Sequence, residues 1–204
     1  MTVQIGCIVE GHGEVEAVPI LIRRVAATLY PELLLVIPHP IRIPKDKVVK
    51  EDELERAVEL AAWNIGGKGG IFILLDSDDD CPAQLGPALR RRALKARGDL
   101  PITVVLAKRE FEAWFLAAAE SLRGKRGLNN KLEPPDNPED IGDAKGWLQQ
   151  RREEGRRYRE TVDQPTLTAQ FDLDQARNAA SFDKCYRDIV YLLNELRKAC
   201  DLSK

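Results

Sequence analysis

Three short stretches of the chain are mostly apolar, and amphipathic stretches separate them. The apolar stretches are residues 3–9, 71–75 and 101–107. Runs of five to seven residues without a polar face are typical of strands buried on both sides of a parallel sheet. A fourth β-rich stretch, residues 33–43, contains Pro38 and Pro40. Because proline cannot donate to a strand ladder, this stretch is predicted to be an edge strand or two short pieces.

The stretches between these strands have the spacing of helices. Apolar residues recur every three or four positions in residues 15–30, 51–65 and 82–97. Pro19 lies inside the first of these, and the regular helix is predicted to start near it because proline is tolerated only in a first turn. Strands that alternate with helices predict an α/β fold, with a mostly parallel sheet flanked by helices.

The last 80 or so residues lack further strands, so the chain is predicted to have two parts. Residues 1–122 form the α/β core, which ends with a helix that starts near residues 108–116. Residues 123–204 form a helical extension packed on the core as a C-terminal helical cap. Its predicted helices are residues 143–152, 173–180 and 182–199, and they follow a loop rich in Gly, Asn and Pro.

Composition indicates the class of protein and its compartment, but not its function. A hydrophobic fraction of 44% and a net charge of −2 over 204 residues are ordinary for a globular protein. No apolar run approaches the ~20 residues that span a bilayer, and the first residues do not resemble a signal peptide. The four cysteines form no CxxC pair, so neither a zinc site nor a disulfide framework is expected. We expect a cytoplasmic protein without a membrane partner.

Carboxylates directly follow two of the predicted strands. Glu10 follows residues 3–9, and Asp76 to Asp80 follow residues 71–75 with only Ser77 between them. Asp76 and Asp78 are two apart, so on an extended backbone they point to the same side. Because parallel strands end at one edge of a sheet, Glu10, Asp76 and Asp78 are expected to converge on one Mg²⁺ or Mn²⁺ ion. The alternative is a solvated turn that caps the next helix.

Further acids occur near the same predicted edge. Glu14 lies one turn beyond Glu10, Asp80 ends the acidic run, and Glu110 and Glu112 follow residues 101–107. They are candidates for supporting the metal ligands or for binding a second metal. The alternative for Glu110 and Glu112 is that they are acids at a helix start, where the helix dipole favours negative charge.

Basic residues offer candidate phosphate contacts. Lys108 and Arg109 follow the last predicted strand and are the candidates for binding a phosphate at the site. Basic runs also occur at residues 90–97, 123–126 and 151–159. A single such run is usually a solvated surface, but the set together is compatible with a nucleic-acid partner, DNA or RNA.

The glutamate after the first strand and the later Asp-x-Asp resemble the Toprim family. The matching residues are Val9-Glu10-Gly11 and Asp76-Ser77-Asp78. The resemblance implies a compact parallel α/β domain that binds Mg²⁺ and acts on nucleic-acid phosphodiesters. It also implies that Glu10 is the general acid/base and that Asp76 and Asp78 are metal ligands.

Over most of its length, the chain is also similar to an uncharacterised bacterial group related to Toprim. The shared features are EGxxE at residues 10–14, the acidic strand end, a KRExEAWF-like helix start at residues 108–115, and DQPxLTxxxDL at residues 163–173.

These observations lead to two functional expectations. The first is metal-dependent phosphodiester chemistry on nucleic acid, a nuclease or nicking activity in a setting such as bacterial defence or DNA repair. The second is a binding or regulatory subunit that works with an ATPase partner. A phospho-acceptor domain of the bacterial receiver type is disfavoured, because such domains carry their acidic pair after the first strand, where this chain has one glutamate and a glycine-rich turn.

Overall fold

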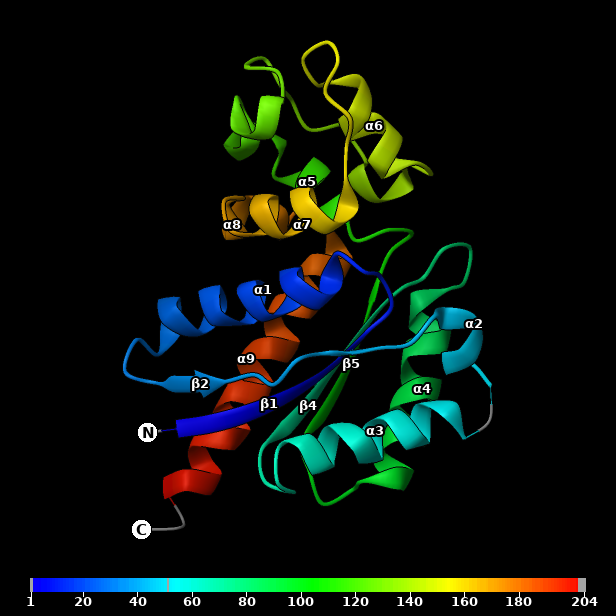
Figure 1. Cartoon of the computed structure of the whole chain (residues 1–204), viewed down its shortest axis with the longest axis vertical. Coiled ribbons are helices and arrows are strands. Elements are labelled where there is room, and N and C mark those ends of the chain that lie inside the picture. The colour runs from blue at the N-terminus through cyan, green and yellow to red at the C-terminus, as the bar shows by residue number, and fades with distance from the viewer. Residues whose placement is uncertain (1, 51, 202–204) are drawn as a thin grey trace.

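The computed structural model describes residues 2–50 and 52–201, and its centre is a parallel sheet (Figure 1). The three long strands are β1 (Thr2–Val9), β4 (Gly70–Asp76) and β5 (Ile102–Ala107). The strand order is β2-β1-β4-β5, and all pairs of neighbours run parallel. Nearly every residue of β4 and β5 is buried, which explains why both strands are apolar without alternation. The predicted α/β class and parallel sheet are confirmed.

The edge beside β1 consists of two short strands. β2 (Leu34–Val36) pairs with the beginning of β1, and β3 (Ile41–Arg42) pairs with its end. Pro38 and Pro40 lie in the gap between them. The edge is therefore interrupted where backbone donors are missing, as the sequence predicts.

Helices cover both faces of this sheet. α3 (Glu53–Asn64) and α4 (Pro82–Ala96) form one buried cluster with one face, whereas α1 (Glu14–Leu29) and α9 (Ala180–Asp201) form another with the opposite face. The short helix α2 (Lys45–Val48) precedes α3. Gly6 of β1 lets α3 approach closely, since a Cβ there would lie 3.1 Å from the carbonyl oxygen of Ala61.

The helix α1 begins earlier than expected. It starts at Glu14, so Pro19 lies inside the helix and not in its first turn. Both Pro19 and its neighbours Ala17, Val18 and Leu21 are buried in the core. Tertiary packing of this apolar face therefore compensates for the backbone hydrogen bond that proline cannot donate.

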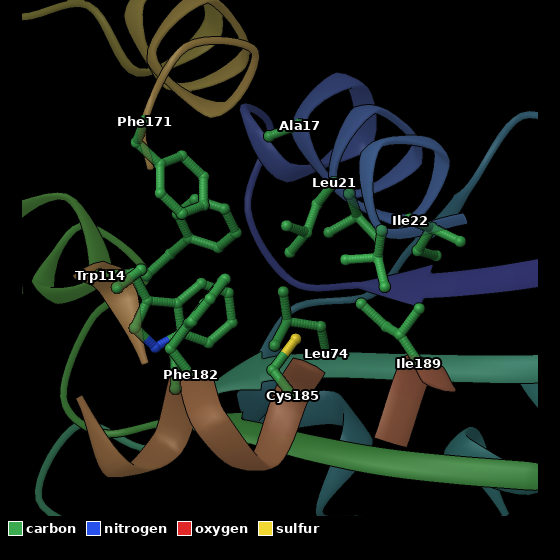
Figure 2. Packing of buried hydrophobic residues seen from close by; sticks show 14 of the residues in the cluster. Ala17, Leu21, Ile22, Leu74, Trp114, Phe171, Phe182, Cys185 and Ile189 are labelled. Atoms are coloured by element: carbon green, nitrogen blue, oxygen red, sulfur yellow. The ribbon is translucent and has the colours of Figure 1, made fainter. Parts of the chain in front are cut away.

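The C-terminal part packs on the core through aromatic side chains. Rings of Trp114, Phe171 and Phe182 meet beside α1, as Figure 2 shows, with centroid separations of 5.2 Å between Trp114 and Phe182 and 5.4 Å between Phe171 and Phe182. These residues belong to one buried cluster that also contains Ala17 and Leu21. Hydrophobic packing thus continues across the domain boundary predicted after residue 122, and that boundary stays a prediction.

The extension contains one helix that the sequence pattern did not predict. Between α5 (Ala113–Ala117) and α9 lie the 3₁₀ turns η1 (Ala119–Leu122), η2 (Lys125–Gly127) and η3 (Pro138–Asp140), and the helices α6 (Ala144–Gln150), α7 (Glu160–Thr168) and α8 (Leu173–Ala176); η1 precedes the predicted boundary. The unpredicted helix is α7, which contains Pro165. Among the described residues, no helix is both long enough and apolar enough to cross a membrane.

Candidate active site

Carboxylates from three strand ends are linked to one another at the carboxyl edge of the sheet. Glu10 follows β1, Asp76 ends β4, and Glu112 follows β5. Glu10 Oε2 accepts a hydrogen bond of 3.2 Å from the backbone N–H of Asp76. Asp76 Oδ1 in turn accepts one of 2.8 Å from the backbone N–H of Phe111, next to Glu112. The parallel sheet therefore places these three acids together, as open α/β sheets do with ligand-binding residues.

The ends of β4 and β5 remain joined beyond the regular ladder. The backbone N–H of Ser77 donates to the carbonyl oxygen of Ala107 at 2.8 Å, and Ser77 Oγ accepts from the backbone N–H of Arg109 at 2.9 Å. Arg109 has a φ of 63°, which turns the chain toward α5. This turn brings Phe111 and Glu112 back beside Asp76.

Glu14 is the fourth acid of this group and is almost fully buried. It is the first residue of α1 and is 2% exposed. Its Oε2 accepts hydrogen bonds from the backbone N–H groups of Glu10 (3.0 Å) and Gly11 (3.1 Å). Glu14 thereby holds the glycine-rich turn after β1 against the helix that follows it.

Glu112 is fully buried, and one of its oxygens is unsatisfied. Its Oε1 accepts from Tyr158 Oη at 2.9 Å and from Gln164 Nε2 at 3.3 Å. Within the described part of the chain, its Oε2 has no hydrogen-bond partner. The nearest positive charge is Lys145 Nζ, 3.9 Å from that oxygen. A buried carboxylate oxygen left in this state is costly, so it marks a position where a ligand would be stabilised.

Lys145 and Glu160, both partly exposed, bring the extension to the border of the site. Lys145 Nζ lies 3.6 Å from Glu160 Oε2, and Glu160 Oε1 accepts from the backbone N–H of Gly13 at 3.2 Å. A Cβ at Gly13 would lie 2.2 Å from Gln164 Oε1, so only glycine fits between the turn and α7. The extension therefore supplies side chains to the site and contacts its backbone.

Burial raises the pKa of all four acids, and the charges of the others add to the effect at Glu14 and Asp76. Burial raises the pKa of Glu14 to about 8 and that of Glu112 to about 7. Burial also raises the pKa of Asp76 well above its usual range, and the charges of Glu14 and Glu112 add to the effect. The pKa of Glu10 is raised mainly by burial.

The same surroundings favour the charged form of Lys145. Burial lowers its pKa, but the charges of Glu112, Glu160, Asp76 and Glu110 outweigh burial, so the pKa is raised overall. A group of acids that resists full ionisation, with one fixed ammonium beside it, is typical of functional sites.

Asp78 and Asp80 lie beside the linked acids and pair with a lysine. Asp78 Oδ2 and Asp80 Oδ2 are 3.0 and 2.9 Å from Lys45 Nζ, which also donates to the carbonyl oxygen of Ser77. Asp78 has a φ of 48°, so the extended backbone on which a shared direction with Asp76 depends has already ended. Asp78 is still close enough that its charge raises the pKa of Glu10.

The other predicted residues have structural partners outside the linked acids. Glu110 Oε2 accepts from the backbone N–H groups of Ala144 (3.0 Å) and Lys145 (3.2 Å) at the start of α6. Lys108 pairs with Asp140 at 2.7 Å. Arg109 Nη1 lies 3.4 Å from Asp79. Glu110 thus positions the helix that carries Lys145.

The linked acids offer only oxygen donors, the type that Mg²⁺ and Mn²⁺ prefer. In residues 2–50 and 52–201, however, no three His, Cys, Asp or Glu side chains are arranged around one metal position. Backbone N–H groups occupy one oxygen each of Glu10, Glu14 and Asp76. The donor chemistry therefore fits a hard cation, whereas the coordination geometry is not assembled.

Sequence reasoning missed four residues of this site: Lys145, Tyr158, Glu160 and Gln164. They come from the extension, and no strand end or local spacing points to them. The stretch of residues 163–173 was the available signal, because it contains Gln164 and stood out as a motif. Because Pro165 lies inside α7, the sequence pattern did not predict the helix that carries Glu160 and Gln164.

Comparison with known proteins gives one match. The family model described as Domain of unknown function (DUF4276) matches residues 9–189, so the chain belongs to this family. No curated protein and no solved structure matches significantly. None of these comparisons connects the chain to the Toprim proteins.

Proposed function

We propose that this DUF4276 member catalyses metal-dependent phosphodiester chemistry on nucleic acid, at the carboxylates of Glu10, Glu14, Asp76 and Glu112. The observation that carries the proposal is Glu112 Oε2, a fully buried oxygen that has no hydrogen-bond partner among the described residues and belongs to a group of acids with raised pKa values. A divalent cation would satisfy that oxygen and relieve the repulsion among the acids.

The roles within the site follow from burial. Asp76 and Glu112 would hold Mg²⁺ or Mn²⁺, with Glu14 fixing the turn beside them. The bound ion supplies neutralisation of charge on the phosphate oxygens. Glu10 is only half-buried, so it is the acid that can exchange a proton with a substrate or with water. Lys145, whose raised pKa keeps it positively charged, would orient a phosphate beside the acids.

The Toprim resemblance supports the same assignment for Glu10 and Asp76. It assigns Asp78 to the metal as well, and in the structure Lys45 pairs with Asp78. We therefore propose Asp78 as a ligand only after Lys45 releases it. Asp80, held by the same lysine, would be released with it.

Metal binding is tested by titrating Mn²⁺ in a calorimeter into wild type, Asp76→Asn and Asp79→Asn. Asp79 is the matched control because it lies three residues away and its side chain is 98% exposed. We expect wild type and Asp79→Asn to bind alike and Asp76→Asn to lose binding. Equal binding by all three proteins would contradict the site.

Activity is tested with Mn²⁺ on single-stranded, double-stranded and supercoiled DNA and on RNA. Glu10→Gln should reduce cleavage by ~10²–10⁴-fold, the usual contribution of general acid–base catalysis, and leave Mn²⁺ binding largely intact. Cleavage by Glu10→Gln at the wild-type rate would remove Glu10 from the chemistry.

The alternative is a non-catalytic subunit that binds an ATPase partner. The observation that favours it is an exposed apolar pair on α3, Trp63 at 78% and Leu60 at 47% exposure. Exposed tryptophan is enriched at protein interfaces. No cleavage of any of these substrates by wild type, together with retained Mn²⁺ binding, would favour this alternative.

A further inference from the structure

Two basic segments that are distant in the sequence lie side by side in the extension. Residues 123–131 and residues 151–159 are joined by an antiparallel bridge between Leu128 and Arg152. The backbone N–H of Asn129 donates to the carbonyl oxygen of Arg151 at 2.9 Å, and that of Glu153 donates to Gly127 at 2.8 Å. In Figure 1 these segments form the loops farthest from the sheet. We call them together the basic double loop.

A buried carboxylate connects the two segments of the double loop. Asp163 of α7 contacts Arg126 Nε at 2.9 Å and Arg152 Nη2 at 3.2 Å. Its other oxygen accepts from the backbone N–H of Arg159 at 2.7 Å. One arginine of each segment is thereby fixed to the same point.

The outer surface of the double loop is strongly positive. Its two segments contain nine Lys and Arg and only two Glu, although the chain as a whole has a net charge of −2. Exposed side chains include Lys125, Arg157 and Arg159. Among the described residues, these three have no ion-pair partner, unlike Arg156, which pairs with Glu153 at 3.0 Å. Positive charge concentrated in this way on an overall acidic protein is the electrostatic feature of a surface that binds a polyanion.

The double loop leads directly into the candidate active site. Tyr158 lies between Arg157 and Arg159 in the sequence, and its hydroxyl donates to Glu112 at 2.9 Å. The next residue after Arg159 is Glu160, which contacts Gly13 and Lys145. Arg157 and Arg159 therefore flank a residue that contacts Glu112 directly, and the segment that carries them continues into the residues that border the site.

We propose that the basic double loop binds the phosphodiester backbone of a nucleic acid and guides it to the carboxylates. This inference rests on the proposed function for the direction of the strand, but binding itself is independent of catalysis. Lys125, Arg157 and Arg159 contact phosphates, and Arg126 and Arg152 position the loops. Binding is independent of sequence, because phosphate contacts carry no base information.

The test measures anisotropy of labelled single-stranded DNA, double-stranded DNA and RNA in EDTA, so that no metal-dependent cleavage occurs. The variant is Lys125→Ala/Arg157→Ala/Arg159→Ala. The control is Arg56→Ala/Arg91→Ala/Arg187→Ala, which removes the same charge from exposed positions on α3, α4 and α9. Circular dichroism verifies that both proteins are folded.

We expect the loop variant to lose affinity roughly tenfold or more, while the control keeps most of it. The slope of log K against log[salt] should become shallower by about 2 to 3 in the loop variant, because each lost phosphate contact contributes ~0.7–0.9. Failure of wild type to bind any of the three nucleic acids would overturn the proposal, as would an equal loss in both variants. Tighter binding to anionic lipid vesicles or to polyglutamate would also overturn it. Binding without cleavage in the Mn²⁺ assay would reject the proposed function and leave this inference standing.

Discussion

Asp163→Asn should destabilise the fold more than the loss of an exposed ion pair of this chain would. The substitution keeps the size of the side chain and an acceptor for the backbone N–H of Arg159, but it removes the negative charge between Arg126 and Arg152. The side chain of Arg126 is 33% exposed and can turn toward water. That of Arg152 is 3% exposed, so its charge stays buried, and among the described residues it is left beside only the carbonyl oxygen of Arg157 at 3.4 Å and the ring of Tyr158 at 5.2 Å.

The magnitude follows from the charge left unpaired. Removing one partner of a buried ion pair costs about 3–5 kcal/mol. Because Arg126 can reach solvent, we expect the lower end, about 3 kcal/mol, out of a total stability on the order of 5–15 kcal/mol for a domain. Burial raises the pKa of Asp163, but its N–H and arginine partners outweigh burial and lower it overall. This contribution is therefore present above the ordinary pKa of Asp, about 3.9, and is lost as the pH falls through the lower pKa of the folded protein.

Urea unfolding followed by circular dichroism measures the effect. The control is Asp99→Asn, whose side chain is 59% exposed and pairs with Arg97 at 2.7 Å. This control should cost much less than Asp163→Asn, because an ion pair in contact with water contributes little to stability. A loss below about 1 kcal/mol for Asp163→Asn at neutral pH would refute the reasoning, because it would mean that Arg152 does not depend on this carboxylate.

Three further outcomes are expected. In EDTA, Glu14→Gln should gain at least about 1 kcal/mol of stability relative to wild type as the pH rises from 5 to 8. The pKa of Glu14 is raised to about 8, so wild type loses stability as the pH rises through that value. Parallel pH profiles in urea unfolding would contradict this. Gly69→Ala should cost about 1–3 kcal/mol, since φ is +132° and a Cβ would lie 2.4 Å from the carbonyl oxygen of Gln4. Gly66→Ala, with φ of +62° and open space around the Cβ, should cost less. Equal losses on thermal melting would show that the clash at Gly69 is relieved. Trp114→Ala should cost about 3–5 kcal/mol in the same melts because the ring is fully buried, and a loss under 1 kcal/mol would show that the aromatic cluster collapses around it.

The sheet was predictable because its strands are encoded locally. The apolar runs around Ile5, Ile73 and Val104 lie in the middle of β1, β4 and β5, each of which has helices on both faces. Parallel pairing then determines which strand ends meet, so the proximity of Glu10, Asp76 and Glu112 could be expected from order alone. The start of α1 could not, because burial of Pro19 outweighs its local preference.

The rest of the site depends on contacts between distant parts of the chain. Glu112 meets Tyr158 and Gln164 across 46 and 52 residues. The spacing of those residues in the sequence does not predict the contact, because the contact depends on how the aromatic cluster packs the extension against the core. The direction of Asp78 also escaped prediction, since one left-handed residue is enough to redirect a side chain that an extended backbone would align.

The position of α9 has a consequence for how the protein emerges during synthesis. This helix packs on β5 and α1, so one face of the sheet lacks one of the two helices that cover it until residues 180–201 have left the ribosome. The apolar side chains of β4 and β5 are made about 75 residues or more before that cover arrives. At a translation rate of ~5–20 residues per second, the nascent sheet waits for several seconds with an open apolar face. During that interval the open apolar face is prone to aggregation, and a ribosome that pauses before residue 180 would prolong the exposure.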